Sequence, residues 1–188
     1  MILADCNPEW PTEFAALRAV YMRSLGELIL RVEHVGSTAV PNLRAKPILD
    51  IDIVMPGYEV FPDIVAHLRR LGYMHNGDQG IREREAFKPL DNMAPYTSPP
   101  RNWMPHHLYV CPANSLELRR HLIFRDALRA RGDLRNEYEK RKLDVALRSG
   151  GDWKVYAQIK EIECRDFVES VLTANLERDQ AQDTARVT

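Results

Sequence analysis

Two aspartates, Asp50 and Asp52, interrupt an otherwise apolar run from residue 47 to residue 55. The run predicts a buried strand, in which both carboxylates point to one face with their backbones about 7 Å apart. Like charges beside an apolar core are costly unless a cation or basic side chains neutralise them. Magnesium suits this role because it takes one or two carboxylates together with phosphate oxygens. We therefore predict that Asp50 and Asp52 bind metal and act in catalysis; the alternative is a strand end that emerges into solvent or pairs with arginines.

A turn of small residues, Gly36-Ser37-Thr38, precedes these aspartates, with twelve residues between Ser37 and Asp50. Glycine lets a backbone approach a phosphate closely, and serine adds a hydroxyl to the N–H donors of such a turn. A Gly-Ser pair alone occurs in many loops. Followed at this spacing by Asp-x-Asp inside an apolar strand, it is much more specific. We expect Gly36, Ser37 and Thr38 to bind the phosphates of the substrate.

The elements that must position these residues predict an α+β fold. It would be a small mixed β-sheet with flanking helices, followed by a C-terminal helical half. One domain would cover residues 1–175, with the sheet-containing core up to about 112, the helical half from 113 to 175, and a fraying polar tail, 176–188. The expected helices are 8–29, 60–71, 115–131, 133–148 and 152–173, capped by Asn7, Ser115, Asp133 and Asp152; the expected strands are 30–35, 47–55, 73–76, 82–88 and 106–111; and a proline-rich loop spans 89–105.

The composition is that of an ordinary globular protein, with 188 residues, 45% hydrophobic, 28% charged and a net charge of −1. Residues 114–160 carry 12 Lys/Arg against 7 Asp/Glu. A nucleic-acid-binding function rests only on this local excess, which solvated helix faces explain equally well. Three cysteines without a CxxC pair argue against a disulfide framework or a cysteine-zinc site. Without a signal-peptide pattern or an apolar segment of ~20 residues, we expect a cytoplasmic protein with no membrane partner.

The string EHVGSTAVP followed by AKPILDIDI resembles the GrpB-like family of bacterial proteins, a branch of the nucleotidyltransferase (DNA polymerase beta-like) superfamily. The resemblance runs from about Trp10 to Phe167. It includes the His107-Leu108 pair, the FRDALR stretch at 124–129, and a late Tyr156 and Lys160. It implies the nucleotidyltransferase fold, a nucleoside triphosphate as partner and one or two magnesium ions. The implied reaction is transfer of a nucleoside monophosphate to an acceptor hydroxyl. The acceptor stays open between a small metabolite, a protein side chain and RNA.

The sequence departs from the superfamily pattern on the expected strand 106–111, which carries no acid where a third carboxylate is usual. His107 and Tyr109 share a face of that strand, and the family usually has histidine at both positions. We predict a catalytic role for His107 as a ligand or general base; the alternative is a histidine bonded to backbone. Glu85, on the preceding expected strand, is the candidate to replace the missing third carboxylate. The departure favours a second hypothesis, a catalytically weak or inactive nucleotide-sensing or scaffold domain that binds a protein partner.

Basic residues near the metal would hold the triphosphate. Lys46 and Arg125, which match family positions, are predicted to bind it. Further candidates, each with a surface charge or an ion pair as its alternative, are Arg129, Lys142 and Lys160. Tyr96 and Trp103, in the proline-rich loop, could cover a base or an acceptor, with packing as their alternative role.

Overall fold

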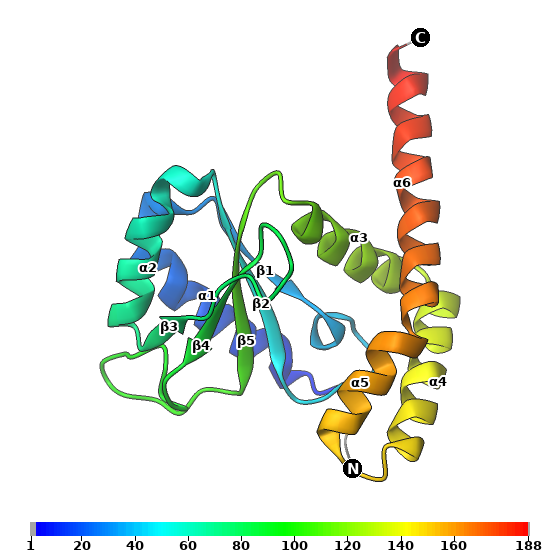
Figure 1. Ribbon diagram of the computed structural model, residues 1–188, viewed down its shortest axis with the longest axis horizontal. Coiled ribbons are helices and arrows are strands. Elements are labelled where there is room, and N and C mark those ends of the chain that lie inside the picture. The colour runs from blue at the N-terminus through cyan, green and yellow to red at the C-terminus, as the bar shows by residue number, and fades with distance from the viewer. Residues whose placement is uncertain (1–2, 188) are drawn as a thin grey trace.

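A five-stranded sheet forms one half of the protein, and the helices α3 to α6 form the other (Figure 1). The computed structural model describes residues 3–187, with side chains for residues 3–176. The strand order is β1-β2-β5-β4-β3; β2 and β5 run parallel, and the other neighbours are antiparallel. The predicted α+β fold with a small mixed sheet is therefore confirmed. The strands are β1 (Arg31–Val35), β2 (Leu49–Met55), β3 (Tyr73–His75), β4 (Glu85–Pro89) and β5 (His106–Pro112).

One face of the sheet is covered by α1 (Glu9–Leu25) and α2 (Phe61–Arg70), which share the main hydrophobic core with β2 and β5. From β2 this core takes Leu49, Ile51, Ile53 and Met55. Each fully buried side chain of this size contributes about 2 kcal/mol through its removal from water. Because side chains alternate along a strand, Asp50 and Asp52 are left on the opposite face, as the sequence predicted.

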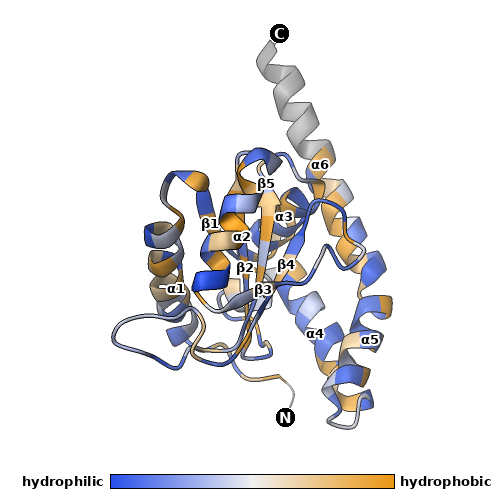
Figure 2. Ribbon diagram, turned by 60° about the vertical axis from the view of Figure 1, so that its left-hand side comes forward, coloured by the Kyte–Doolittle hydropathy of each residue, from blue (hydrophilic) through white to orange (hydrophobic). Residues whose placement is uncertain are grey.

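That opposite face is covered by α3 (Leu116–Ala130), whose Leu118 packs against Val54 and Cys111. The helices α4 (Gly132–Arg148), α5 (Trp153–Glu163) and α6 (Arg165–Val187) complete the helical half. In Figure 2, α4 is largely hydrophilic in colour, whereas β2 and β5 are largely hydrophobic. The two aspartates of β2 lie on the face of the sheet that α3 covers, and His121 of α3 contacts Asp52.

The helical half differs from the prediction in two ways. The expected helix 152–173 is two helices that meet at Cys164, because α5 packs Tyr156 into one apolar cluster and α6 packs Phe167 into another. Ser115 and Asp152 cap their helices as predicted, but Asp133 lies inside α4, where it pairs with Arg131. The predicted fraying concerns the tail 176–188. The side chains after residue 176 lie outside the described part of the structure, so this stays a prediction.

Two further elements have boundaries that differ from the prediction, and a turn sets each of them. The expected strand 82–88 begins only at Glu85, because Glu83 has φ 61° and closes a turn just before it. Asn42 also adopts positive φ, 60°, the conformation expected where the family tends to have glycine. The expected helix 8–29 ends at Leu25, and a short 3-10 turn, Gly26–Leu28, follows it.

A buried hydrogen-bonded triad links α1, β3 and β5 beneath the sheet. The Tyr73 hydroxyl lies 2.6 Å from His106 Nε2 and 2.7 Å from the Tyr21 hydroxyl. Because His106 Nδ1 lies 2.9 Å from the carbonyl oxygen of Met104, to which it donates, Nε2 is the acceptor in this network. The triad fixes the first residue of β5, next to His107.

Replacing Tyr73 by phenylalanine should lower the free energy of unfolding by about 1–3 kcal/mol, because His106 Nε2 loses its best donor in a buried site. Urea denaturation followed by circular dichroism measures the loss. Tyr96→Phe is the matched control, since Tyr96 is exposed and its hydroxyl donates to Asp91 at the surface. Equal losses in the two variants would contradict a special contribution from the triad.

Candidate functional site

The register of the sheet brings five side chains into one row on the face opposite the main core. Asp50 pairs with His107 on β5, and Asp52 pairs with Tyr109 on β5 and Glu33 on β1. Directly opposite residues share a face of the sheet, with their side chains a few ångströms apart. The structure therefore brings the predicted residues Asp50, Asp52 and His107 together, and it adds Glu33 and Tyr109.

Asp52 is fully buried and bonded to a histidine from the helical half. His121 Nδ1 lies 2.7 Å from Asp52 Oδ2, and His121 Nε2 lies 3.2 Å from Glu117 Oε1 on the same helix, α3. Burial lowers the pKa of His121, but the hydrogen bonds that His121 donates to Asp52 and Glu117 outweigh burial and raise that pKa to about 10. His121 is therefore an imidazolium at neutral pH. The other oxygen, Asp52 Oδ1, is buried without a hydrogen-bond partner among the described residues.

Asp50 lies directly against the predicted phosphate turn. A Cβ atom at position 36 would overlap Asp50 Oδ2, so only glycine permits this approach. Gly36 also has φ 69° and ψ −169°, a conformation that only glycine adopts readily. Burial raises the pKa of Asp50, and the nearby His107 and Lys160 lower it. The Gly36 backbone and the Asp50 carboxylate thus form one surface.

Thr38 holds the turn from within. Its hydroxyl lies 3.0 Å from His34 Nε2 and 3.4 Å from the carbonyl oxygen of Ile48, just before β2. The His34 ring stacks on Phe14 at 4.6 Å. Burial, together with nearby arginines, lowers the pKa of His34 to about 4, so this histidine stays neutral. Thr38 positions the turn relative to β2, while Ser37, one residue earlier, begins the 3-10 turn Ser37–Ala39.

Two lysines approach Asp50 from the helical half and the start of β2. Lys46 Nζ lies over the rings of Tyr156, at 4.6 Å, and Trp153, at 5.4 Å, both from α5. Burial lowers the pKa of Lys46, Lys160 lowers it further, and Asp50 raises it. The pKa of Lys160 is raised by Tyr138, Tyr156 and Asp50, against the effect of burial. Positive charge is therefore concentrated next to Asp50.

Lys142 takes no part in this cluster. Its side chain is buried, and Nζ donates to the carbonyl oxygen of Arg44 and lies 5.1 Å from the Tyr138 ring. Burial and the nearby Lys160 lower its pKa to about 7. Lys142 thus links α4 to the segment before β2.

Arg125 and Arg129 reach from α3 to the chain around the Gly-Ser turn. Arg125 donates to Glu33 at 2.8 Å, to the carbonyl oxygen of His34 at 3.1 Å and to Asp126 at 2.8 Å. Arg129 Nε donates to the carbonyl oxygen of Ala39 at 2.9 Å. Both arginines brace the turn, and the role of Arg125 as a phosphate ligand stays a prediction.

Glu33 is the acid that joins this row. The prediction that Glu85 replaces the missing third carboxylate is wrong. Glu85 pairs with Val110, so it lies on the other face of the sheet, where its carboxylate contacts His75 at 2.7 Å. Glu33 lies opposite Asp52, although both its oxygens are bound, one by Arg125 and one by Arg31. The site therefore contains a third carboxylate that is held by internal cations.

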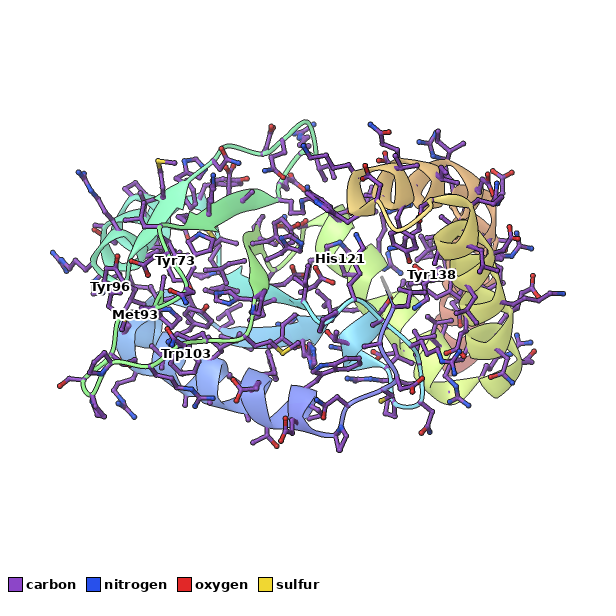
Figure 3. All side chains as sticks on the ribbon, turned by 90° about the horizontal axis from the view of Figure 1, so that it is seen from below. Tyr73, Met93, Tyr96, Trp103, His121 and Tyr138 are labelled. Atoms are coloured by element: carbon purple, nitrogen blue, oxygen red, sulfur yellow. The ribbon has the colours of Figure 1, made fainter. Side chains whose placement is uncertain are left out.

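The two aromatic residues of the proline-rich loop do not cover this site. Trp103 donates to the carbonyl oxygen of Pro95 at 2.9 Å and belongs to the main core on the other face of the sheet. Tyr96 is exposed and bonds Asp91. Figure 3 shows both far from His121, on the side away from Tyr138. Their packing role, the alternative raised above, is the one observed.

The donor set around Asp52 fits magnesium in one respect and limits it in another. A buried carboxylate oxygen without a partner, Asp52 Oδ1, is a free ligand for a hard cation. Among the described residues, however, no group of three or more His, Cys, Asp or Glu side chains converges as a metal site. The residues present therefore suit an ion that completes its shell with phosphate oxygens from a substrate.

Comparisons with known proteins bear on the family and the fold of the chain. A family model described as GrpB protein matches residues 1–173. The UPF0157 protein PA4798 of Pseudomonas aeruginosa is 35% identical over 155 residues, covering 82% of this chain and 61% of that protein. The crystal structure of conserved protein GrpB from Enterococcus faecalis matches with TM-score 0.75 and 27% identity, over 93% of this chain and 99% of that one. Cid1 in complex with its short product ApU matches with TM-score 0.54 and 12% identity, over 84% of this chain and 44% of that one.

These matches confirm the predicted nucleotidyltransferase-type fold, and the Cid1 likeness concerns the fold alone. The chain spans 42% of the length of another relative, the UPF0157 protein YqkA of Bacillus subtilis. Across the described residues, none of the helices combines the length and the apolarity that a membrane crossing requires.

Proposed function

Because the chain belongs to the GrpB family and shares its fold with the Cid1 poly(U) polymerase, we propose that it is a magnesium-dependent nucleotidyltransferase. The enzyme would transfer a nucleoside monophosphate from a nucleoside triphosphate to an acceptor hydroxyl. The observation that carries this proposal is the contact between Gly36 and Asp50. It places a glycine backbone suited to phosphate beside a carboxylate suited to metal, with the free Asp52 Oδ1 two residues further along the strand.

The side chains around this contact divide the chemistry among them. Lys46 and Lys160 place positive charge beside Asp50, where a triphosphate would lie. His107, exposed and opposite Asp50, can take the proton of an acceptor hydroxyl. The acceptor oxygen then bonds to the α-phosphorus, the bond from that phosphorus to the β-bridging oxygen breaks, and pyrophosphate leaves with the electron pair. Magnesium, when bound, would neutralise charge on the phosphate oxygens.

A second function, nucleotide binding without turnover, has its own supporting observation. His121 already neutralises Asp52 and is itself held by Glu117. A carboxylate whose charge is balanced internally has less need of a metal ion than a free one. In this alternative the domain senses a nucleotide, or acts as a scaffold for a protein partner.

Asp50→Asn and Asp52→Asn should each abolish the stabilisation that a nucleoside triphosphate with magnesium gives to the wild type. A ligand at 100 times its Kd stabilises a protein by about 2.7 kcal/mol, or roughly 5–10 °C for a chain of this size. A thermal-shift panel of the four ribonucleoside triphosphates, each with and without Mg²⁺, measures this effect. Asp63→Asn, an exposed aspartate on α2, is the control and should keep the full shift.

The outcomes separate the two functions. A magnesium-dependent shift that both site variants lose, together with pyrophosphate release, supports the transferase. The same shift without pyrophosphate release, across small alcohols, peptides and RNA ends as acceptors, supports nucleotide sensing. If no nucleotide shifts the melting temperature of the wild type, both forms of the proposal fail.

A further inference from the structure

A cavity of about 260 Å³ adjoins the row of acids on the side away from the helical half. It lies over β4 and β5, on the face of the sheet that carries Asp50 and Asp52, because Ala86 pairs with Tyr109 and Tyr109 pairs with Asp52. We call it the β4–β5 pocket. The side chains that the argument uses belong to Asn76, Gln79, Ala86, Lys88, His107 and Tyr109.

The pocket is hollow because its floor is a small residue, Ala86, with the long side chain of Lys88 beside it. Ala86 and Lys88 alternate along β4 and point to the same face of the sheet, and Arg84 is the residue just before β4. The Arg84 guanidinium stacks over the Tyr109 ring at 4.4 Å, and its Nε is buried without a hydrogen-bond partner among the described residues. Lys88, at the other end, is exposed. Lys88 is therefore the cation in the lining of the pocket, while the Arg84 guanidinium supports the Tyr109 wall from outside it.

The position of the pocket relative to Asp50 identifies its role in the proposed reaction. His107 is both a wall of the pocket and the residue opposite Asp50. Of the lysines expected to hold the triphosphate, Lys160 comes from α5, and Lys46, from the segment before β2, lies against the rings of α5, so both approach Asp50 from the α5 side. The triphosphate and the contents of the pocket would thus meet at Asp50 from opposite directions, with His107 between the pocket and the aspartate.

We propose that the β4–β5 pocket binds the acceptor and that this acceptor is a small anionic alcohol. Its phosphate or carboxylate lies at Lys88, Gln79 and Asn76 bond its other polar groups, and its hydroxyl faces His107. The inference rests on the proposed transferase function. In the reaction, the hydroxyl oxygen bonds to the α-phosphorus of the nucleotide, its proton passes to His107, and pyrophosphate leaves.

The size and charge of the pocket favour a small molecule over a polymer. At about 260 Å³, it lies below the range of roughly 300–1,000 Å³ typical of sites for larger organic ligands. A single-stranded nucleic acid needs a continuous positive groove. Residues 76–89, which include the edge of the pocket, carry three acidic and three basic residues, so this edge has no net charge. Of these three basic residues, Lys88 is the one that lines the pocket.

The test uses glycerol 3-phosphate and glycerate as anionic probes and glycerol as the neutral control, in thermal-shift and calorimetric titrations of the full chain. We expect at least one anion to bind, with about tenfold or greater loss of affinity in Lys88→Met because a charged hydrogen-bond partner is removed. Ala86→Leu, which fills the floor, should abolish binding, and Ala86→Val covers the case in which leucine impairs folding. Lys140→Met, an exposed lysine of α4, should change nothing.

Failure of this inference differs from failure of the proposed function. No binding of either anion at 10 mM (about three orders of magnitude above a Kd of 10 μM), or equal affinity in Lys88→Met and Lys140→Met, overturns the acceptor pocket and leaves the nucleotide shift untouched. A weaker magnesium-nucleotide shift in Lys88→Met would assign the pocket to the nucleotide and overturn the inference as well. Tighter, steeply salt-dependent binding of an oligoribonucleotide would replace the small acceptor with a polymer. Lys88-dependent anion binding without any nucleotide shift would keep the pocket and reject the transferase.

Discussion

Alanine in place of Gly36 should remove nucleotide binding and lower the free energy of unfolding by about 2–4 kcal/mol. Two causes act together. The backbone at position 36 has φ 69° and ψ −169°, which is strained for any residue with a Cβ. The added methyl group would also overlap the Asp50 carboxylate, so Asp50 must leave the position in which it faces the turn. Chemical denaturation measures the stability, and the magnesium-nucleotide thermal shift measures the site.

Gly26→Ala is the control for the backbone cost alone. Gly26 also has positive φ, 51°, but a Cβ there meets nothing within 4 Å. This variant should lose stability by about 1–2 kcal/mol and keep its nucleotide shift. If Gly36→Ala retained a full nucleotide shift while losing the same stability as Gly26→Ala, the contact between the turn and Asp50 would have no part in binding.

The sequence was sufficient for those parts of the fold and site that depend on local patterns. Apolar alternation around Asp50 and Asp52 predicted both the strand and the face of each side chain, because alternation is a property of the strand itself. The Gly36 turn could be predicted for the same reason, since its residue types reflect a backbone conformation. Element boundaries moved by a few residues where a turn, such as that at Glu83, depends on one unusual φ angle.

The partners of these residues could not be predicted, because they depend on register and on packing between distant segments. His121 contacts Asp52 from 69 residues further along the chain, and no local pattern marks it as a site residue. Glu33 was visible in the sequence, but only the pairing of β1 with β2 places it opposite Asp52. The Glu85 assignment failed for the complementary reason: one step along β4 reverses the face of the sheet.

The pairing of His121 with Asp52 has a consequence for stability that depends on pH. His121 has an ordinary pKa of 6.5 in the unfolded chain and about 10 in the fold, because Asp52 and Glu117 hold its proton. Since the folded state binds this proton more tightly, the stabilisation is fully present below pH 6.5 and is lost as the pH rises through 10. The difference in pKa corresponds to about 5 kcal/mol. Tyr109, whose ring lies 6.5 Å from His121, has a pKa raised by burial to about 12, so it stays neutral in this range.

His121→Gln should therefore be less stable than the wild type by about 5 kcal/mol at pH 6, and this difference should shrink to about 1–2 kcal/mol at pH 10.5. Other groups that titrate in the same interval, such as Lys142 with its pKa lowered to about 7, are common to both proteins and cancel in the difference. Urea denaturation at the two pH values gives the measurement. Asn136→Gln, a change between non-titrating side chains at an exposed position of α4, should show a difference from the wild type that is the same at both pH values. A difference for His121→Gln that stayed constant from pH 6 to pH 10.5 would mean that no proton is shared between His121 and Asp52. The Asp52 carboxylate would then have to be neutral or paired with another cation. A group other than His121 would then balance its charge in the absence of a metal ion.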